Sequence, residues 1–150
     1  MEQKDYLLRE IEKIGLIINA IRQKLFGGKG NLSLTVENQF ETLKEMLLTE
    51  TNFDLDKFLS LNIEESNEYL CSFKGFSAEN IEHLAECISD ICLSDNYRGS
   101  KKYLEKALQL YELCNSKSKT YSLERETTIM SIKTVVSNWQ IKERTTGHKL

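Results

Sequence analysis

Hydrophobic side chains recur along the chain at every third or fourth residue, which is the spacing of a helical face. Between Leu7 and Leu25 the steps alternate between four and three residues, so these side chains share one side of a helix. The same period is clear in residues 78–93, whereas alternation with a period of two appears only briefly, in residues 31–36. The pattern therefore predicts an all-α fold of five to seven helices.

The predicted helices span residues 4–26, 35–50, 62–74, 78–93, 100–115 and 122–141, with a short helical piece before Asn62. Their starts carry side chains that cap free N–H groups, namely Ser33 or Thr35, Asn62 and Ser77. The first helix ends at the glycine run 27–30, which lacks the spacing of a phosphate-binding loop and follows no strand. No proline interrupts any of these segments, as long helices require.

The 150 residues are enough for one domain with its own hydrophobic core. We expect a long N-terminal amphipathic helix (4–26), an acidic helical middle (35–74), antiparallel helical hairpins (78–141) and a polar tail (142–150). With 40% hydrophobic and 29% charged residues, the chain belongs to neither the disordered nor the membrane-embedded class.

The N-terminus and the cysteines predict a cytoplasmic protein without a membrane segment. The longest apolar run, Leu16 to Ile18, is too short for a signal peptide or a spanning helix. The cysteine spacing matches no zinc or disulfide framework, so we expect reduced and mostly buried thiols. The four cysteines are Cys71, Cys87, Cys92 and Cys114.

The net charge of −3 conceals an uneven distribution of charge along the chain. Residues 31–96 carry 14 acidic and 3 basic side chains, whereas residues 97–150 carry 5 acidic and 11 basic ones. We therefore expect the C-terminal helices to present a basic surface, including Lys101, Lys102 and Lys106, to an acidic peptide or to another subunit. The acidic total disfavours a nucleic-acid partner.

The apolar surface of the first helix is wider than a single neighbouring helix requires. Packing between two neighbours of the same chain would explain this width. The alternative is a homodimer seam or a partner-docking surface that includes Leu7, Ile14 and Ile18, because large apolar patches are rarely left exposed. Gly15, in the middle of the helix, would permit close helix–helix approach in either case.

His83 and Cys87 are four residues apart, a spacing that can present two metal ligands from one helical turn. A metal site needs a third protein ligand, however, and the other histidine is His148 in the tail. The pair also lacks the orienting group and the oxyanion turn of a Cys–His nucleophile. We therefore predict no metal site, no cofactor and no catalytic residues.

The C-terminal half resembles tetratricopeptide repeats, which are helical hairpins. Ile81, Leu84, Ala85 and Ile88 have the I-x-x-L-A-x-x-I spacing of the first repeat helix. Ala107, Tyr111 and Cys114 resemble the A-x-x-x-F-x-x-A of the second helix, although ten extra residues separate the two halves and the usual proline is missing. Residues 5–12 are similar to the start of small uncharacterised bacterial proteins with such C-terminal halves. The resemblance implies binding to proteins or peptides.

These observations lead to one functional prediction and one alternative. The prediction is a non-enzymatic protein–protein interaction or scaffold module that self-associates through its N-terminal helix or binds another protein or peptide. The alternative is a small-molecule or metal-binding enzyme with a site between helices near His83 and Cys87.

Overall fold

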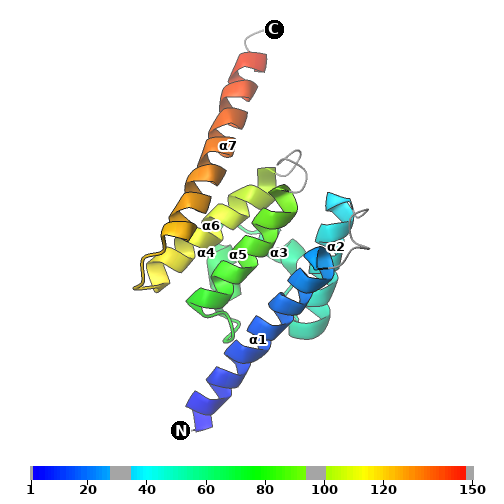
Figure 1. Ribbon diagram of the computed structural model, residues 1–150, viewed down its shortest axis with the longest axis vertical. Helices are drawn as coiled ribbons and strands as arrows, with labels where there is room; N and C mark the ends of the chain where they lie inside the picture. Colours follow the sequence, from blue (N-terminus) through cyan, green and yellow to red (C-terminus); the bar gives the residue numbers. More distant parts are fainter. Residues whose placement is uncertain (1, 28–34, 94–100, 148–150) are drawn as a thin grey trace.

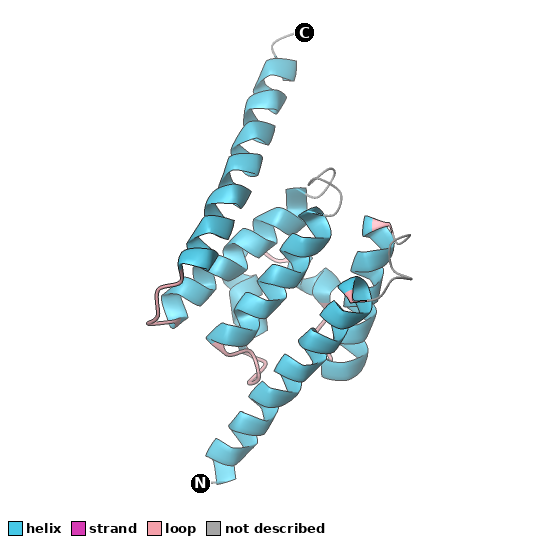
Figure 2. Ribbon diagram, in the orientation of Figure 1, coloured by secondary structure: helices cyan, strands magenta, loops and turns pink. Residues whose placement is uncertain are grey.

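The computed structural model describes the backbone of residues 2–27, 35–93 and 101–147, and the side chains of residues 4–27, 35–93 and 101–139 (Figure 1). Within these ranges every regular element is an α-helix (Figure 2), which confirms the predicted fold class. The helices are α1 (Glu2–Phe26), α2 (Val36–Thr51), α3 (Leu55–Ser60), α4 (Ile63–Cys71), α5 (Ala78–Leu93), α6 (Lys101–Lys117) and α7 (Leu123–Gly147).

The antiparallel pair α5 and α6 forms the centre of the molecule (Figure 1). α1 packs against α5 and α2 on one side of this pair, and α7 packs against α6 on the other side. The short helices α3 and α4 pack together and close the end of the core between α2 and α6. The N-terminal end of α1 and the C-terminal end of α7 project from opposite ends of the long axis (Figure 1).

Thr35, Asn62 and Ser77 start their helices as expected, and the alternative capping residue Ser33 lies outside the described residues. The Thr35 hydroxyl accepts a hydrogen bond from the backbone N–H of Asn38, at 3.1 Å. The side-chain oxygens of Asn62 and Ser77 accept the backbone N–H groups three residues ahead, at 2.8 and 3.2 Å. Each bond satisfies a donor that the first helical turn leaves free. Sequence alone therefore located these helix starts correctly.

The core is continuous from α1 to α7 and is richest along α5, whose apolar stripe is fully buried. An aromatic cluster fills the space around α3, α4 and the start of α5, and comprises Phe53, Phe58, Tyr69, Phe73 and Phe76. The helical spacing of Ile63, Leu70 and Phe73 predicts that Ile63 faces inward, but its side chain is 67% exposed. The first turn of α4 instead contacts α6 through its backbone, since the Ile63 carbonyl accepts a hydrogen bond from the Gln109 side-chain nitrogen at 3.3 Å.

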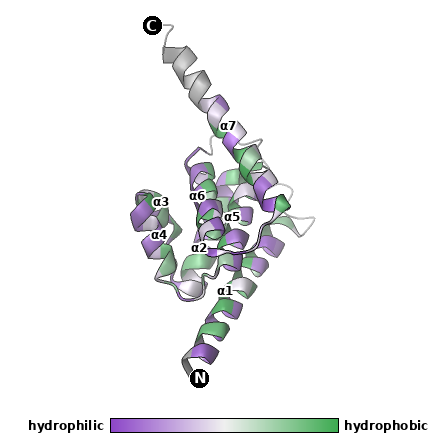
Figure 3. Ribbon diagram, turned by 90° about the vertical axis from the view of Figure 1, so that its left-hand side faces the viewer, coloured by the Kyte–Doolittle hydropathy of each residue, from purple (hydrophilic) through white to green (hydrophobic). Residues whose placement is uncertain are grey.

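Most of α1 lies on this core, whereas its first turns extend beyond it. The exposed side chains of Tyr6, Leu7 and Leu8 lie on this projecting part, where hydrophobic and hydrophilic segments alternate along the helix (Figure 3). In the described part of the chain, no helix has both the length and the apolar content needed to span a membrane.

Candidate functional site

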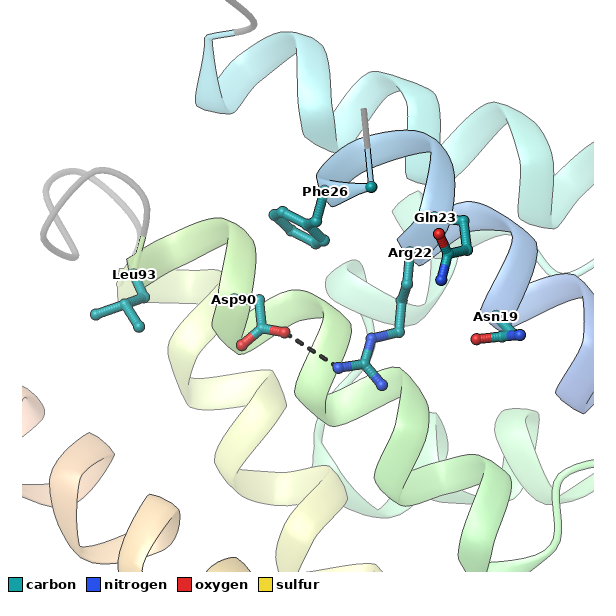
Figure 4. Close-up of a pocket in the computed structure, with 7 residues that line it drawn as sticks. Asn19, Arg22, Gln23, Phe26, Asp90 and Leu93 are labelled. Atoms are coloured by element: carbon teal, nitrogen blue, oxygen red, sulfur yellow. Dashed lines mark hydrogen bonds and ion pairs between the residues drawn. The ribbon is translucent and has the colours of Figure 1, made fainter. Parts of the chain in front are cut away.

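The surface between α1 and α5 is hollowed by two adjoining pockets. One pocket, of about 470 Å³, lies where the C-terminal ends of α1 and α5 meet (Figure 4). The other, of about 350 Å³, lies nearer the start of α5. Asn19 and Arg22 line both pockets, so the two adjoin along the contact between α1 and α5, and together they are called here the α1–α5 groove. Its other principal lining residues are Glu12, Leu16, Gln23, Phe26, Glu79, His83, Asp90 and Leu93.

Asn80 fixes the position of α1 beside α5. Its side-chain nitrogen donates hydrogen bonds to the backbone carbonyls of Ile11 on α1 and of Gly75, both at 2.8 Å. Gly15 makes room for this contact, because a Cβ on that residue would lie only 3.1 Å from the Asn80 side-chain oxygen. This confirms the expectation that Gly15 permits close helix approach. The groove opens beside this tight contact.

Arg22 spans the middle of the groove and holds two carboxylates of α5. Its guanidinium donates to Glu86 at 3.1 Å and to Asp90 at 3.3 Å, and Figure 4 shows the Arg22 side chain reaching Asp90. Burial raises the pKa of both carboxyl groups, although Arg22 acts in the opposite direction. Two partly buried carboxylates therefore share one guanidinium.

Apolar and acidic side chains form the rim of the groove. Leu16 is 63% exposed, and Phe26 and Leu93 are 42% and 53% exposed at the far end. His83 is half-exposed, with its Nε2 3.7 Å from Glu79 and its Nδ1 4.0 Å from Glu86. The groove thus combines apolar contact surface with an excess of negative charge, a combination suited to binding.

His83 and Cys87 lie in different surroundings, because His83 is half-exposed and Cys87 is buried. Cys87 is completely buried in the core, and burial raises the pKa of its thiol to about 12. A buried thiol that stays protonated at neutral pH is a poor nucleophile. Within the described ranges, no three His, Cys, Asp or Glu side chains are grouped so that they could hold a metal ion. His148 lies outside the described residues.

The residues proposed for docking on the first helix have different surroundings from those expected. Ile14 and Ile18 are buried in the core of their own chain, against the neighbours α2 and α5. Ile14 and Ile18 therefore present no docking surface, whereas Leu8, Leu16 and Phe26, which widen the apolar surface of α1, are 55%, 63% and 42% exposed. Leu7 is also exposed, on the projecting turns.

The lysines proposed for the basic surface are also distributed differently from the expectation. Lys102 is exposed and Lys101 is half-buried, whereas Lys106 is only 7% exposed. The Lys106 ammonium donates to the Leu61 carbonyl, the Ser66 hydroxyl and the Gln109 side-chain oxygen, at 2.9–3.1 Å. The Lys106 ammonium is thus bound within its own chain and offers almost no surface to a partner.

Residues 101–139 of the C-terminal half expose side chains of both charge signs. Arg125 is buried and donates to Glu82 at 2.9 Å. The exposed cations there are interspersed with exposed acidic side chains, namely Lys102, Lys117, Lys119 and Lys133 among Glu105, Glu112 and Glu124. The buried Arg125 therefore does not contribute to a basic surface, and the basic surface of the C-terminal helices stays a prediction.

Sequence reasoning missed Asn19, Arg22 and Asp90, which carry the chemistry of the groove. Their roles depend on the contact between α1 and α5. In the sequence, Arg22 is more than 60 residues from its partners Glu86 and Asp90. One local signal was present, because Glu86 and Asp90 are four residues apart on a face of α5 beside its apolar stripe.

Comparison with known proteins leaves the family of the chain open. No protein-family model matches the sequence, and no curated protein or solved structure matches it either. The function is therefore argued from the groove itself.

Proposed function

We propose that this chain is a non-enzymatic protein-binding module whose α1–α5 groove receives a segment of another protein. The observation that carries the proposal is the groove itself, which joins two pockets along two helices and exposes Leu16, Phe26 and Leu93 on its rim. Clustered apolar side chains flanked by polar ones are typical of peptide-binding surfaces. Helices and peptides are often bound in grooves between helices.

The shape of the groove favours a macromolecular ligand over a small one. Small-molecule sites enclose most of the ligand surface, whereas both pockets here open to solvent between α1 and α5. The charged groups at the centre are engaged with one another, since Arg22 binds both Glu86 and Asp90. This arrangement supports binding rather than catalysis near His83.

Self-association through α1 is the second form of the proposal. It is favoured by the exposed Tyr6, Leu7 and Leu8 on the turns of α1 that project from the core. Exposed apolar side chains gathered at a helix end are suited to contact with a second chain. Light scattering of the wild type and a Leu7→Asp variant distinguishes this form, because a dimer formed through these turns dissociates in the variant.

Partner capture with matched variants tests the groove. The tagged wild type and the variants Leu16→Asp, Phe26→Asp and Met130→Asp are purified from the native cells, and the proteins that accompany each are identified by mass spectrometry. Met130 lies on α7 and is 69% exposed, comparable to Leu16. We expect the specific partners to be lost with both groove variants and retained with Met130→Asp. Partners that remain with both groove variants contradict the proposal.

A further inference from the structure

The centre of the α1–α5 groove lacks enough positive charge to balance its carboxylates. Asp90 lines the groove, and Glu86 lies one turn before it on α5. Both share the single guanidinium of Arg22, and the side chains of Asp90 and Glu86 are 44% and 36% exposed. Burial already raises the pKa of both carboxyl groups despite that guanidinium. The pair is therefore stabilised in its charged form partly by the water that still reaches it.

The surrounding lining residues increase this imbalance. α1 contributes Glu12 to the lining of the groove, and α5 contributes Glu79 beside His83. Among the described residues that line the groove, Arg22 is the one lysine or arginine. The described part of the groove consequently has a net negative charge along its length.

A ligand that covered the groove would remove the remaining water from these carboxylates. An apolar or acidic segment would leave two desolvated carboxylates with one cation, which is unfavourable. A segment that brings its own cation restores the balance and keeps its apolar side chains against the rim. The charge of the groove therefore constrains the chemistry of what it binds.

We propose that the ligand of the α1–α5 groove is a cationic amphipathic segment of another protein. In this arrangement a lysine or arginine binds beside Glu86 and Asp90, and flanking apolar side chains contact Leu16, Phe26 and Leu93. This inference rests on the proposed binding function and specifies the class of partner.

Synthetic amphipathic helices of defined charge test the inference on the full chain. The probes have leucine on one face and lysine, glutamine or glutamate on the other. Binding is followed by calorimetry and by amide chemical shifts of the isotope-labelled protein. We expect the lysine helix to shift the signals of Asn19, Arg22, His83 and Asp90, and to bind at least about tenfold more tightly than the glutamine helix.

Two double variants, each lacking two carboxylates, distinguish an effect of the groove charge from an effect of the net charge of the protein. Glu86→Gln combined with Asp90→Asn removes the central carboxylates, whereas Glu45→Gln combined with Glu50→Gln removes two exposed carboxylates of α2. We expect the first variant to lose the preference for lysine over glutamine, and the second to retain it. The single variant Asp90→Asn replaces the groove double variant if thermal unfolding shows that the latter is not folded.

Several results would overturn the inference. Equal binding of the lysine and glutamine helices, an equal loss of affinity in both double variants, or shifts confined to α2 would each contradict it. A dimer whose interface covers the groove would identify the occupant as a second copy and would also contradict it. Failure of the proposed function gives a different result, because the Leu16→Asp and Phe26→Asp variants would then recover the same partners as the wild type.

Discussion

The side-chain nitrogen of Asn80 on α5 donates a hydrogen bond to the backbone carbonyl of Ile11 on α1, 2.8 Å away. The same nitrogen donates to the Gly75 carbonyl at 2.8 Å. Asn80 is 4% exposed, so little of it is in contact with water. One amide therefore joins α1, α5 and the turn before α5, and holds the two walls of the groove at a fixed separation.

Replacing Asn80 with alanine is expected to destabilise the fold by about 1–3 kcal/mol, because it removes both hydrogen bonds at a buried position. Urea denaturation followed by circular dichroism measures this loss. Asn19→Ala is the control, since Asn19 is exposed in the groove, and its effect should stay within about 0.5 kcal/mol. Equal stabilities of the two variants would show that the Asn80 amide does not hold α1 in place.

Gly75 marks the closest approach between α1 and the turn before α5. A Cβ at this position would collide with the Ile14 side chain and would lie 2.5 Å from the Glu10 carbonyl. Because a backbone atom cannot move aside as a side chain does, Gly75→Ala should cost about 1–3 kcal/mol of stability.

Gly15→Ala is the comparison for Gly75→Ala. It also adds one methyl group where α1 meets the start of α5, but it adds it to α1. Its Cβ would lie 3.1 Å from the Asn80 side-chain oxygen, while alanine in a helix gains about 1 kcal/mol over glycine. We therefore expect a net change below about 1 kcal/mol. Thermal unfolding of the two variants side by side tests the difference, and a Gly75→Ala variant as stable as the wild type would contradict it.

Lys106 is expected to contribute to stability and not to partner binding. Lys106→Met keeps the length of the side chain but removes the ammonium donor from the oxygens of Leu61, Ser66 and Gln109, of which Ser66 keeps the Gln109 side-chain nitrogen as a donor. Because burial also lowers the pKa of Lys106, its charge carries a desolvation cost that methionine avoids. We expect the loss of hydrogen bonds to dominate, with a net destabilisation of about 1–3 kcal/mol.

Lys102→Met is the matched control, because Lys102 lies one turn earlier on α6 and is exposed. It should change the free energy of unfolding by no more than about 0.5 kcal/mol. Guanidinium denaturation of both variants measures the contrast. If Lys102→Met were the more destabilising of the two, the structural role of Lys106 would be refuted.

The helices and most of the core were predictable from the sequence because their signals are local. The caps at Thr35, Asn62 and Ser77 act over three residues, and the stripe on α5 repeats within each turn. A helical period identifies a buried face but does not identify what covers it. This is why Ile14 and Ile18 could be read as a docking seam, although α2 and α5 cover them.

The groove and the buried lysine were not predictable, because both depend on distant parts of the chain. Lys106 becomes buried through acceptors at Leu61 and Ser66, at least 40 residues away. Lysines are mostly exposed, so the sequence favoured a surface position. Arg22 likewise finds Glu86 only after α1 has packed against α5. Residue type and spacing carry no information about such pairs.

Glu86→Gln tests the charge imbalance of the groove through the pH dependence of stability. Burial raises the pKa of Glu86 above its ordinary value of 4.5, so the folded state binds this proton more tightly than the unfolded state does. The protonated Glu86 therefore stabilises the wild type fully below about pH 4.5. This stabilisation is lost as the pH rises through the pKa that Glu86 has in the folded state. Glutamine has no proton to lose.

The stability of Glu86→Gln relative to the wild type should consequently increase between about pH 4 and pH 7. Arg22 retains Asp90 as a partner, which limits the loss of the ion pair in the variant. Urea denaturation across this range measures the difference, with Glu45→Gln as the control that removes the same charge from an exposed position on α2. A difference that is constant with pH, or that decreases towards neutral pH, would show that Arg22 fully compensates both carboxylates.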